Sequence, residues 1–130
     1  MTTKISLQKL PETKEIDGAK RWTEEKGEFV QIAYDETARH IALFELKAGF
    51  NRGDHWHGKK EEVFYVAKGK IRALWRDLDT GEAGEILLTP GHKLSIATRI
   101  WHIFYGLEDA LVVEYSPQKY ENSDTFRVDG

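Results

Sequence analysis

Short apolar runs separated by turn-forming residues restrict the fold of this chain more than any other feature. From Glu28 onward, most runs are five to eight residues long and rich in β-branched and aromatic residues, which is typical of strands. They cover residues 28–34, 40–46, 61–67, 70–77, 85–89, 93–97, 100–105 and 110–115. No segment keeps a helical period over three turns. So many short, closely spaced strands predict an all-β sandwich or barrel, and we expect a jelly roll.

Alternation within one run predicts which side chains fill the interior of this barrel. Ile71, Ala73 and Trp75 alternate with Arg72 and Arg76, so that the apolar side chains share one face of the strand. We therefore expect the first three to be buried and the two arginines to face solvent.

The length and composition of the chain fit one soluble domain. The chain has 130 residues, of which 40% are hydrophobic and 32% charged, enough for a single core but not for two. Residues 1–20 are polar and are expected to be irregular. We predict an N-terminal arm over residues 1–27 and a single barrel domain over residues 28–130.

Several classes of function are disfavoured by what the chain lacks. It has no cysteine, which excludes disulfides, thiolate metal sites and a cysteine nucleophile. The net charge of −3 gives no overall attraction to nucleic acid or to an anionic membrane. No run approaches transmembrane length and the start does not resemble a signal peptide, so we expect a cytoplasmic protein without nucleic-acid or membrane partners.

Four side chains are candidates for a metal site. His55 and His57 stand two residues apart on a predicted strand and therefore project from the same face. A turn can then reverse the chain, so that Glu62 begins the antiparallel neighbour, and His102 can complete the set from a later strand. Three neutral imidazoles and one carboxylate suit one divalent transition metal (Zn, Fe, Mn, Ni or Co) with one or two positions open. His40 has no such context and is expected to be an exposed strand residue.

The spacing of these residues resembles the first motif of the cupin superfamily. The segment from Gly49 to Gly69 matches it without a gap: glycine, five residues, His-x-His, four residues, glutamate, six residues, glycine. This spacing selects Glu62 over Glu61, which we expect to be solvated. The resemblance implies a cupin jelly-roll β-barrel, also called a double-stranded β-helix, as the domain at residues 28–130.

The second cupin motif is matched less well. Where the motif has Pro-x-Gly, this chain has Ala97, Thr98 and Arg99, and the final asparagine of the motif is Gly106. His102 still falls at the expected offset. The departures therefore concern the turn before His102 and not the ligand itself.

The flanking residues resemble RmlC-like cupins that rearrange nucleotide-linked keto-sugars. The likeness rests on Arg52-Gly53-Asp54-His55-Trp56-His57, on Ile100-Trp101-His102, and on the ending Tyr120 to Asp124-Thr125-Phe126. It implies a metal-dependent epimerase or isomerase of a nucleotide-linked keto-sugar in polysaccharide biosynthesis. The keto-sugar isomerases usually lack the glutamate ligand, so Glu62 favours a branch that binds metal. Arg52 is the predicted substrate-binding residue, because a guanidinium can bind a phosphate or carboxylate in bidentate fashion. The neighbouring Lys59 or Lys60 could also contact such a group.

Two other functions stay open at this point. One is a metal-dependent dioxygenase of a small molecule, and the other is a non-catalytic metal- or sugar-binding cupin. A basic groove from Arg52 to the metal would favour the sugar enzyme, and a small dry apolar cavity the dioxygenase.

The general acid or base is not assigned, because Tyr65 and Tyr105 face away from the ligands by strand parity. Phe64, Val66 and Phe104 are expected to form pocket wall or core. A homodimer is the expected assembly, since edge strands invite pairing.

Overall fold

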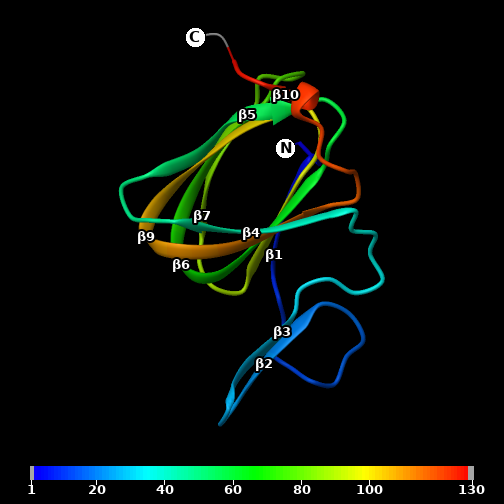
Figure 1. Cartoon of the computed structure of the whole chain (residues 1–130), viewed down its shortest axis with the longest axis vertical. Coiled ribbons are helices and arrows are strands. Elements are labelled where there is room, and N and C mark those ends of the chain that lie inside the picture. The colour runs from blue at the N-terminus through cyan, green and yellow to red at the C-terminus, as the bar shows by residue number, and fades with distance from the viewer. Residues whose placement is uncertain (1, 129–130) are drawn as a thin grey trace.

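The computed structural model describes residues 2–128, which form ten strands and one 3₁₀ turn (Figure 1). The strands are β1 (Ile5–Lys9), β2 (Lys20–Glu24), β3 (Gly27–Gln31), β4 (His40–Leu46), β5 (Asn51–His57), β6 (Glu62–Asp77), β7 (Ala83–Leu88), β8 (His92–Ile96), β9 (Ile100–Ser116) and β10 (Thr125–Phe126), with the 3₁₀ turn η1 (Asn122–Asp124) before β10. The described residues contain no α-helix, and hence none of a length and apolarity that would cross a membrane.

Two long strands, β6 and β9, organise the barrel. They pair antiparallel along most of their length, and each unites two of the apolar runs in the sequence. Their register is irregular around Gly69, which has a φ of 83°. A Cβ atom at Gly69 would lie 2.2 Å from the carbonyl oxygen of Asp109, so only glycine allows the two strands to approach this closely.

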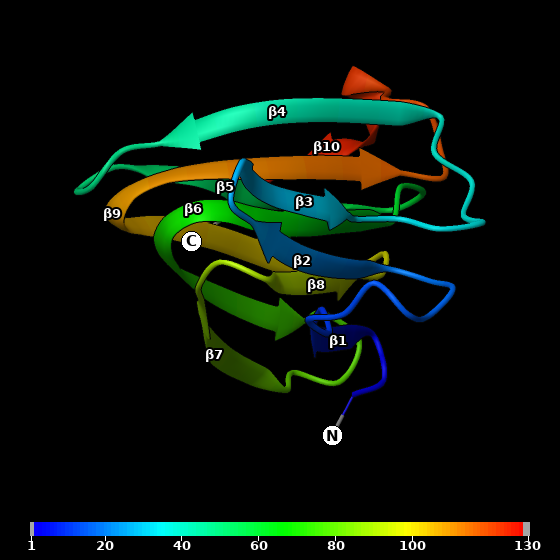
Figure 2. The ribbon, with the colours of Figure 1, turned by 90° about the horizontal axis from the view of Figure 1, so that it is seen from below.

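The two halves of β6 and β9 belong to opposite walls of the barrel. One wall runs β1, β8, the first half of β6, the second half of β9, and β4. The other runs β7, the second half of β6, the first half of β9, β5 and β10. Figure 2 shows both long strands curling from one wall to the other. This arrangement confirms the predicted all-β jelly roll.

The core lies between these walls and follows the predicted alternation. Ile71, Ala73 and Trp75 are buried, Arg76 is exposed and Arg72 is half-exposed. Aliphatic and aromatic side chains from the other strands complete the core, among them Leu46, Val66, Leu88, Leu94, Ile96, Ile100 and Val112.

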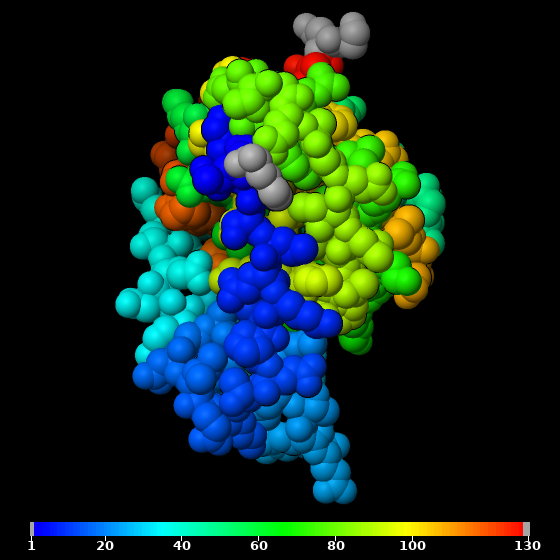
Figure 3. Space-filling model, turned by 180° about the vertical axis from the view of Figure 1, so that it is seen from behind, coloured from blue at the N-terminus to red at the C-terminus, as the bar shows by residue number. Residues whose placement is uncertain are grey.

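The N-terminal segment differs from the prediction of an irregular stretch over residues 1–20. Residues 5–9 form β1, which pairs with β8 and places Ile5 opposite Ile96. Of the five side chains of β1, only that of Ile5 is buried, and so the sequence carries little apolar alternation to reveal the strand. Figure 3 shows this segment, in dark blue, running over the outside of the barrel.

The strand predicted over residues 28–34 ends earlier than expected and lies outside the barrel. This strand, β3, pairs with β2 in a separate two-stranded sheet that projects from the barrel (Figures 1 and 3). Trp22 stacks on Phe29 across this hairpin, with ring centroids 4.5 Å apart. Phe29 therefore packs within the hairpin and not in the barrel core. The division into an arm over residues 1–27 and a domain over residues 28–130 stays a prediction.

Candidate metal centre

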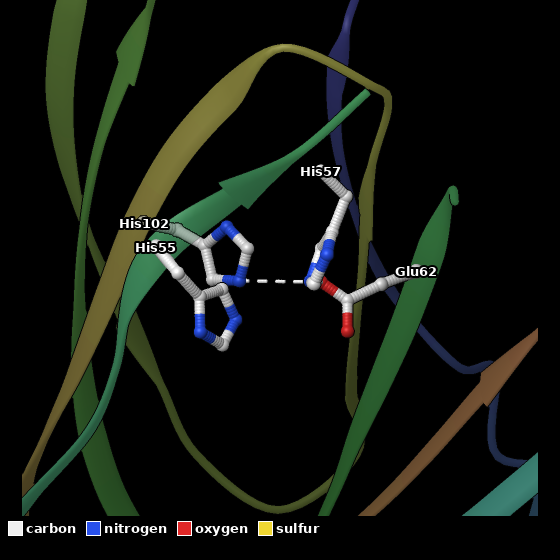
Figure 4. Close-up of side chains that lie close together, drawn as sticks. All are labelled: His55, His57, Glu62 and His102. Carbon is white, nitrogen blue, oxygen red and sulfur yellow. Dashed lines mark ion pairs between the residues drawn. The ribbon is translucent and has the colours of Figure 1, made fainter. Parts of the chain in front are cut away.

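The four predicted ligands converge at one point inside the barrel (Figure 4). His55 and His57 come from β5, Glu62 is the first residue of β6, and His102 lies on β9. One ligand-type atom of each lies within 4.8 Å of those of the other three. His57, Glu62 and His102 are buried, whereas His55 is half-buried and lies closest to solvent.

A β-bulge in β5 directs the histidine pair into the barrel. β5 pairs with β9 so that His55 lies opposite His102, and the register shifts between Gly53 and His55. Asp54 is the extra residue and has a φ of 62°. Between the two histidines, Trp56 points away from the site and stacks on Phe126, with centroids 4.6 Å apart.

The turn before His102 forms despite its departure from the cupin motif. Arg99 has a φ of 62°, the conformation that the glycine of the motif adopts most easily. The Arg99 N–H donates to the carbonyl oxygen of His57 (2.8 Å), and the guanidinium donates to Asp79 (2.7 Å). These contacts compensate for the left-handed backbone and bring His102 next to β5.

The second departure, Gly106 in place of asparagine, has a steric reason. A Cβ atom at Gly106 would lie 2.4 Å from the carbonyl oxygen of Lys47. The chain between β4 and β5 therefore occupies the space that a side chain at position 106 would need.

Backbone carbonyls orient two of the three imidazoles. His57 Nδ1 lies 3.0 Å from the carbonyl oxygen of Asp124, and His102 Nδ1 lies 3.1 Å from that of Ile100. A proton on each Nδ1 leaves Nε2 facing the site. Both Nε2 atoms lie 3.2 Å from Oε1 of Glu62.

The ionisable groups of the site shift one another's pKa values. Burial raises the pKa of Glu62, but the imidazoles of His102 and His57 outweigh this and hold it well below its usual range. Burial lowers the pKa of His57, but the Glu62 carboxylate more than offsets it, so that the net pKa is raised. Burial and the two neighbouring imidazoles lower the pKa of His55 to about 4. His55 is therefore neutral at physiological pH, as a metal ligand must be.

The donor set fits a divalent transition metal. His57 Nε2 and Glu62 Oε1 are buried and, despite their 3.2 Å separation, neither has a hydrogen-bond partner of suitable geometry within residues 2–128. Leaving a buried polar atom unpaired costs about 1–3 kcal/mol, so such atoms indicate a missing partner. Three imidazole nitrogens and one carboxylate oxygen are the ligands that zinc, iron, manganese, nickel and cobalt accept.

A pocket of about 390 Å³ opens onto this cluster. Besides the four candidate ligands, its lining comprises His40, Ala42, Phe44, Arg52, Gly53, Lys60, Phe64, Phe104, Glu114, Tyr120 and Thr125. Arg52 is exposed and lines the wall of this pocket. Its Nε donates to the carbonyl oxygen of Glu45 (2.8 Å), and its guanidinium lies over the Phe44 ring at 5.3 Å.

Of the two lysines that the sequence offered as a substrate contact, the structure places Lys60 in the pocket wall. It is only 5% exposed, its Nζ lies 3.4 Å from Oε2 of Glu62, and it sits over the Tyr120 ring at 4.9 Å. Its neighbour Lys59 is exposed and pairs with Glu121. No local pattern distinguishes the two lysines, because their directions depend on the C-terminal segment that covers the turn.

His40 and Glu114 also line the pocket. The prediction of an exposed His40 is wrong, because β4 directs residues 40, 42 and 44 to its inner face. The alternation His40, Ala42, Phe44 was the signal that could have located it. Burial raises the pKa of Glu114, and the nearby Glu62 carboxylate raises it further.

The remaining parity predictions are confirmed. Phe64 and Phe104 line the pocket, and Val66 is fully buried in the core. Tyr65 and Tyr105 lie outside the pocket lining, Tyr65 buried on the other side of β6 and Tyr105 under the Arg72 guanidinium.

Comparison with known sequences identifies the family of this chain. Residues 22–123 match the model of the polysaccharide biosynthesis C-terminal domain. A UDP-2-acetamido-2,6-beta-L-arabino-hexul-4-ose reductase from Pseudomonas aeruginosa is 32% identical over 108 residues, which are 78% of this chain and 29% of that protein. An alanine–tRNA ligase from Lactobacillus delbrueckii subsp. bulgaricus is 33% identical over 79 residues, 61% of this chain and 8% of the ligase. The chain thus spans less than a third of the length of these curated relatives.

Solved structures confirm the cupin fold of the RmlC-like type. A sugar 3,4-ketoisomerase from Thermoanaerobacterium thermosaccharolyticum in complex with TDP superposes with a TM-score of 0.78 at 18% identity, covering 98% of this chain and 90% of that one. A dTDP-4-dehydrorhamnose 3,5-epimerase from Sulfolobus tokodaii gives 0.79 at 19% identity, covering 96% and 77%. A TDP-quinovose 3,4-ketoisomerase from Campylobacter jejuni gives 0.76 at 14% identity, covering 98% and 95%.

Proposed function

This chain belongs to the polysaccharide biosynthesis C-terminal domain family, and on that premise we propose that it is a metal-dependent epimerase or isomerase of a nucleotide-linked keto-sugar. The observation that carries the proposal is one pocket that joins four metal-ligand side chains to the cations Arg52 and Lys60. We propose His55, His57, Glu62 and His102 as ligands of one divalent metal per chain. The fold neighbours named for keto-sugar isomerases and epimerases support the reaction class.

The chemistry of the reaction requires three things of the site. A proton next to a carbonyl must be removed, the negative charge that develops on the carbonyl oxygen must be stabilised, and the proton must be returned. When bound, a divalent metal supplies the Lewis acid that polarises the carbonyl. Glu114 and His40 line the same pocket outside the ligand set, and we propose these two as candidates for taking up a proton from the substrate.

The pocket also offers positive charge to an anionic substrate. Arg52 lies in the wall beside the ligands, and the buried Lys60 holds its ammonium group against Glu62. A phosphate or diphosphate accepts charge-assisted hydrogen bonds from such groups. The Arg52 guanidinium therefore favours the sugar nucleotide over the dioxygenase alternative, which would suit a small dry apolar cavity.

Assembly and location stay predictions within this proposal. Among the described strands, β4 pairs with β9 alone, and its other edge would be available to a second chain in the expected homodimer. We also retain the cytoplasm as the expected location.

The proposed function is tested by proton exchange. Metal-loaded protein would be incubated in D₂O with a panel of nucleotide-linked 4-keto-sugars, and mass spectrometry and NMR would follow deuterium at the carbons next to the carbonyl. We expect exchange with at least one member of the panel and none without metal. Neither binding nor exchange across the panel would contradict the sugar function, and oxygen uptake with Fe(II)-loaded protein would then test the dioxygenase.

Replacing Arg52 is expected to weaken substrate binding but not metal binding. Loss of a charge-assisted pair is worth about 1.5–3 kcal/mol, so Arg52→Ala should raise the Kd for the active nucleotide sugar by about one to two decades. Calorimetric titration measures the Kd, and elemental analysis measures the metal content. Lys59→Ala is the matched control, because Lys59 is exposed and absent from the pocket lining, and it should leave both quantities unchanged. Equal Kd values for Arg52→Ala and wild type would remove Arg52 from the substrate site.

A further inference from the structure

We propose that Asp124 is a positioning residue that holds His57 and Glu62 in the geometry a metal requires, an inference that rests on the metal centre of the proposed function. Asp124 is only 5% exposed and ends the 3₁₀ turn η1, far along the chain from both ligands. It does not reach the ligand cluster with its own side chain. Its effect runs through the chain segment that joins the two ligands.

The Asp124 carboxylate fixes the turn between His57 and Glu62. It accepts hydrogen bonds from three consecutive backbone N–H groups, those of Gly58 (3.0 Å), Lys59 (3.0 and 3.1 Å) and Lys60 (3.0 Å). Bonds to a charged acceptor are among the stronger hydrogen bonds in proteins. The turn begins directly after His57 and ends two residues before Glu62. These hydrogen bonds from the turn to the Asp124 carboxylate therefore set the distance between His57 and Glu62.

The backbone of the same residue orients the His57 ring. The carbonyl oxygen of Asp124 lies 3.0 Å from His57 Nδ1, and an N–H at Nδ1 leaves the Nε2 lone pair for the site. Hydrogen bonds of this kind to the second ring nitrogen of a histidine ligand fix its tautomer and orientation. One residue thus controls both a ligand ring and the turn that leads to the next ligand.

Other contacts anchor the C-terminal segment independently of the Asp124 side chain. β10 pairs with β5, with Thr125 opposite His57, and Phe126 stacks on Trp56. The side chain of Gln118 accepts a hydrogen bond from the N–H of Glu61 (2.8 Å). A substitution of the Asp124 carboxylate should therefore loosen the turn while the segment stays in place.

The test compares Asp124→Ala, Asp124→Asn and Asp109→Ala in the full chain. Asp109 is the matched control, because its carboxylate also accepts a backbone N–H, that of Ala48 (3.0 Å), but this bond lies outside the turn that joins His57 to Glu62. Zn²⁺ affinity would be measured by competition with a chelator, and Co²⁺ absorption spectra would report the ligand geometry. Thermal unfolding of the metal-free proteins defines the temperature at which every variant is folded.

We expect Asp124→Ala to weaken Zn²⁺ binding about 10- to 100-fold, the range found for partners of metal ligands, and to alter the Co²⁺ spectrum. Asp124→Asn keeps the shape and one acceptor oxygen but turns its amide N–H toward a backbone N–H, so it should recover only part of the affinity, whereas Asp109→Ala should behave as wild type. A Zn²⁺ affinity of Asp124→Ala within threefold of wild type, together with an unchanged Co²⁺ spectrum, would overturn the proposal. A loss of Zn²⁺ affinity in Asp124→Ala that is no larger than the loss in Asp109→Ala would overturn it as well.

A second readout separates this inference from the proposed function. The ring ¹⁵N chemical shifts of His57 in the metal-free protein report its Nδ1–H bond to the carbonyl of residue 124, and the looser turn directly after His57 in Asp124→Ala should move the ring and change these shifts. If wild type bound no metal, the metal-dependent function would fail, and unchanged His57 shifts in the variant would then overturn the positioning role as well.

Discussion

His57→Ala is expected to reduce the metal content of the purified protein from close to one divalent ion per chain to a small fraction of that value. The variant loses a buried ligand whose Nε2 lies 3.2 Å from Glu62, and it also loses the ring that Asp124 holds in place. Three remaining donors cannot complete a four-ligand set, and so the affinity should fall by several decades. Elemental analysis and Zn²⁺ titration measure the effect.

His40→Ala is the control for this variant, because His40 lines the same pocket without belonging to the ligand cluster. It should retain wild-type metal content. Unchanged occupancy in His57→Ala would show instead that the four side chains form a structural cluster without a metal.

The same site should release its metal as the pH falls below about 6, since free histidine titrates near pH 6.5. In the metal-free chain the net pKa of His57 is raised by Glu62, so that protons compete for this ring at a higher pH than for an isolated histidine. Protonation favours the metal-free state, and the stabilisation by metal is therefore present at neutral pH and lost on acidification.

Trp75→Ala is expected to lower the free energy of unfolding by about 3–5 kcal/mol, which is a large share of the stability of a domain of this size. Trp75 is only 6% exposed within the core, and a Cβ atom at Gly84 on the paired strand would lie 2.7 Å from its indole ring. The indole therefore fills the space beside a glycine, which has no side chain to close the cavity that removal of the indole leaves. Urea unfolding of the metal-free protein measures the change.

Arg72→Ala on the opposite face of the same strand is the comparison. The Arg72 side chain is 44% exposed and forms an ion pair with Glu85 at 3.5 Å. Because such exposed pairs stabilise a protein little, Arg72→Ala should lower the free energy of unfolding by about 1 kcal/mol or less. A cost for Arg72→Ala as large as that for Trp75→Ala would contradict the burial of the Trp75 face.

The sequence alone was sufficient for the strands from β4 to β9 and for the four candidate ligands. Strand parity placed His55 and His57 on one face, and the motif spacing distinguished Glu62 from Glu61, which is exposed. These are local properties, because the side-chain period of a strand and the length of a turn are set by neighbouring residues. The fit of Ile71, Ala73 and Trp75 to the core follows for the same reason.

Only the tertiary structure decided what surrounds the ligands. Lys60 enters the pocket whereas Lys59 does not, and Asp124 reaches a turn that lies 64 to 66 residues earlier in the chain. Strand β1 is similarly defined by its pairing with β8 and not by its own composition. Such contacts depend on which distant segments meet in the fold. The physical reason is that the backbone groups of an edge strand and the buried charged side chains find their hydrogen-bond partners on segments distant in the sequence, and these partnerships leave no periodic pattern along the chain.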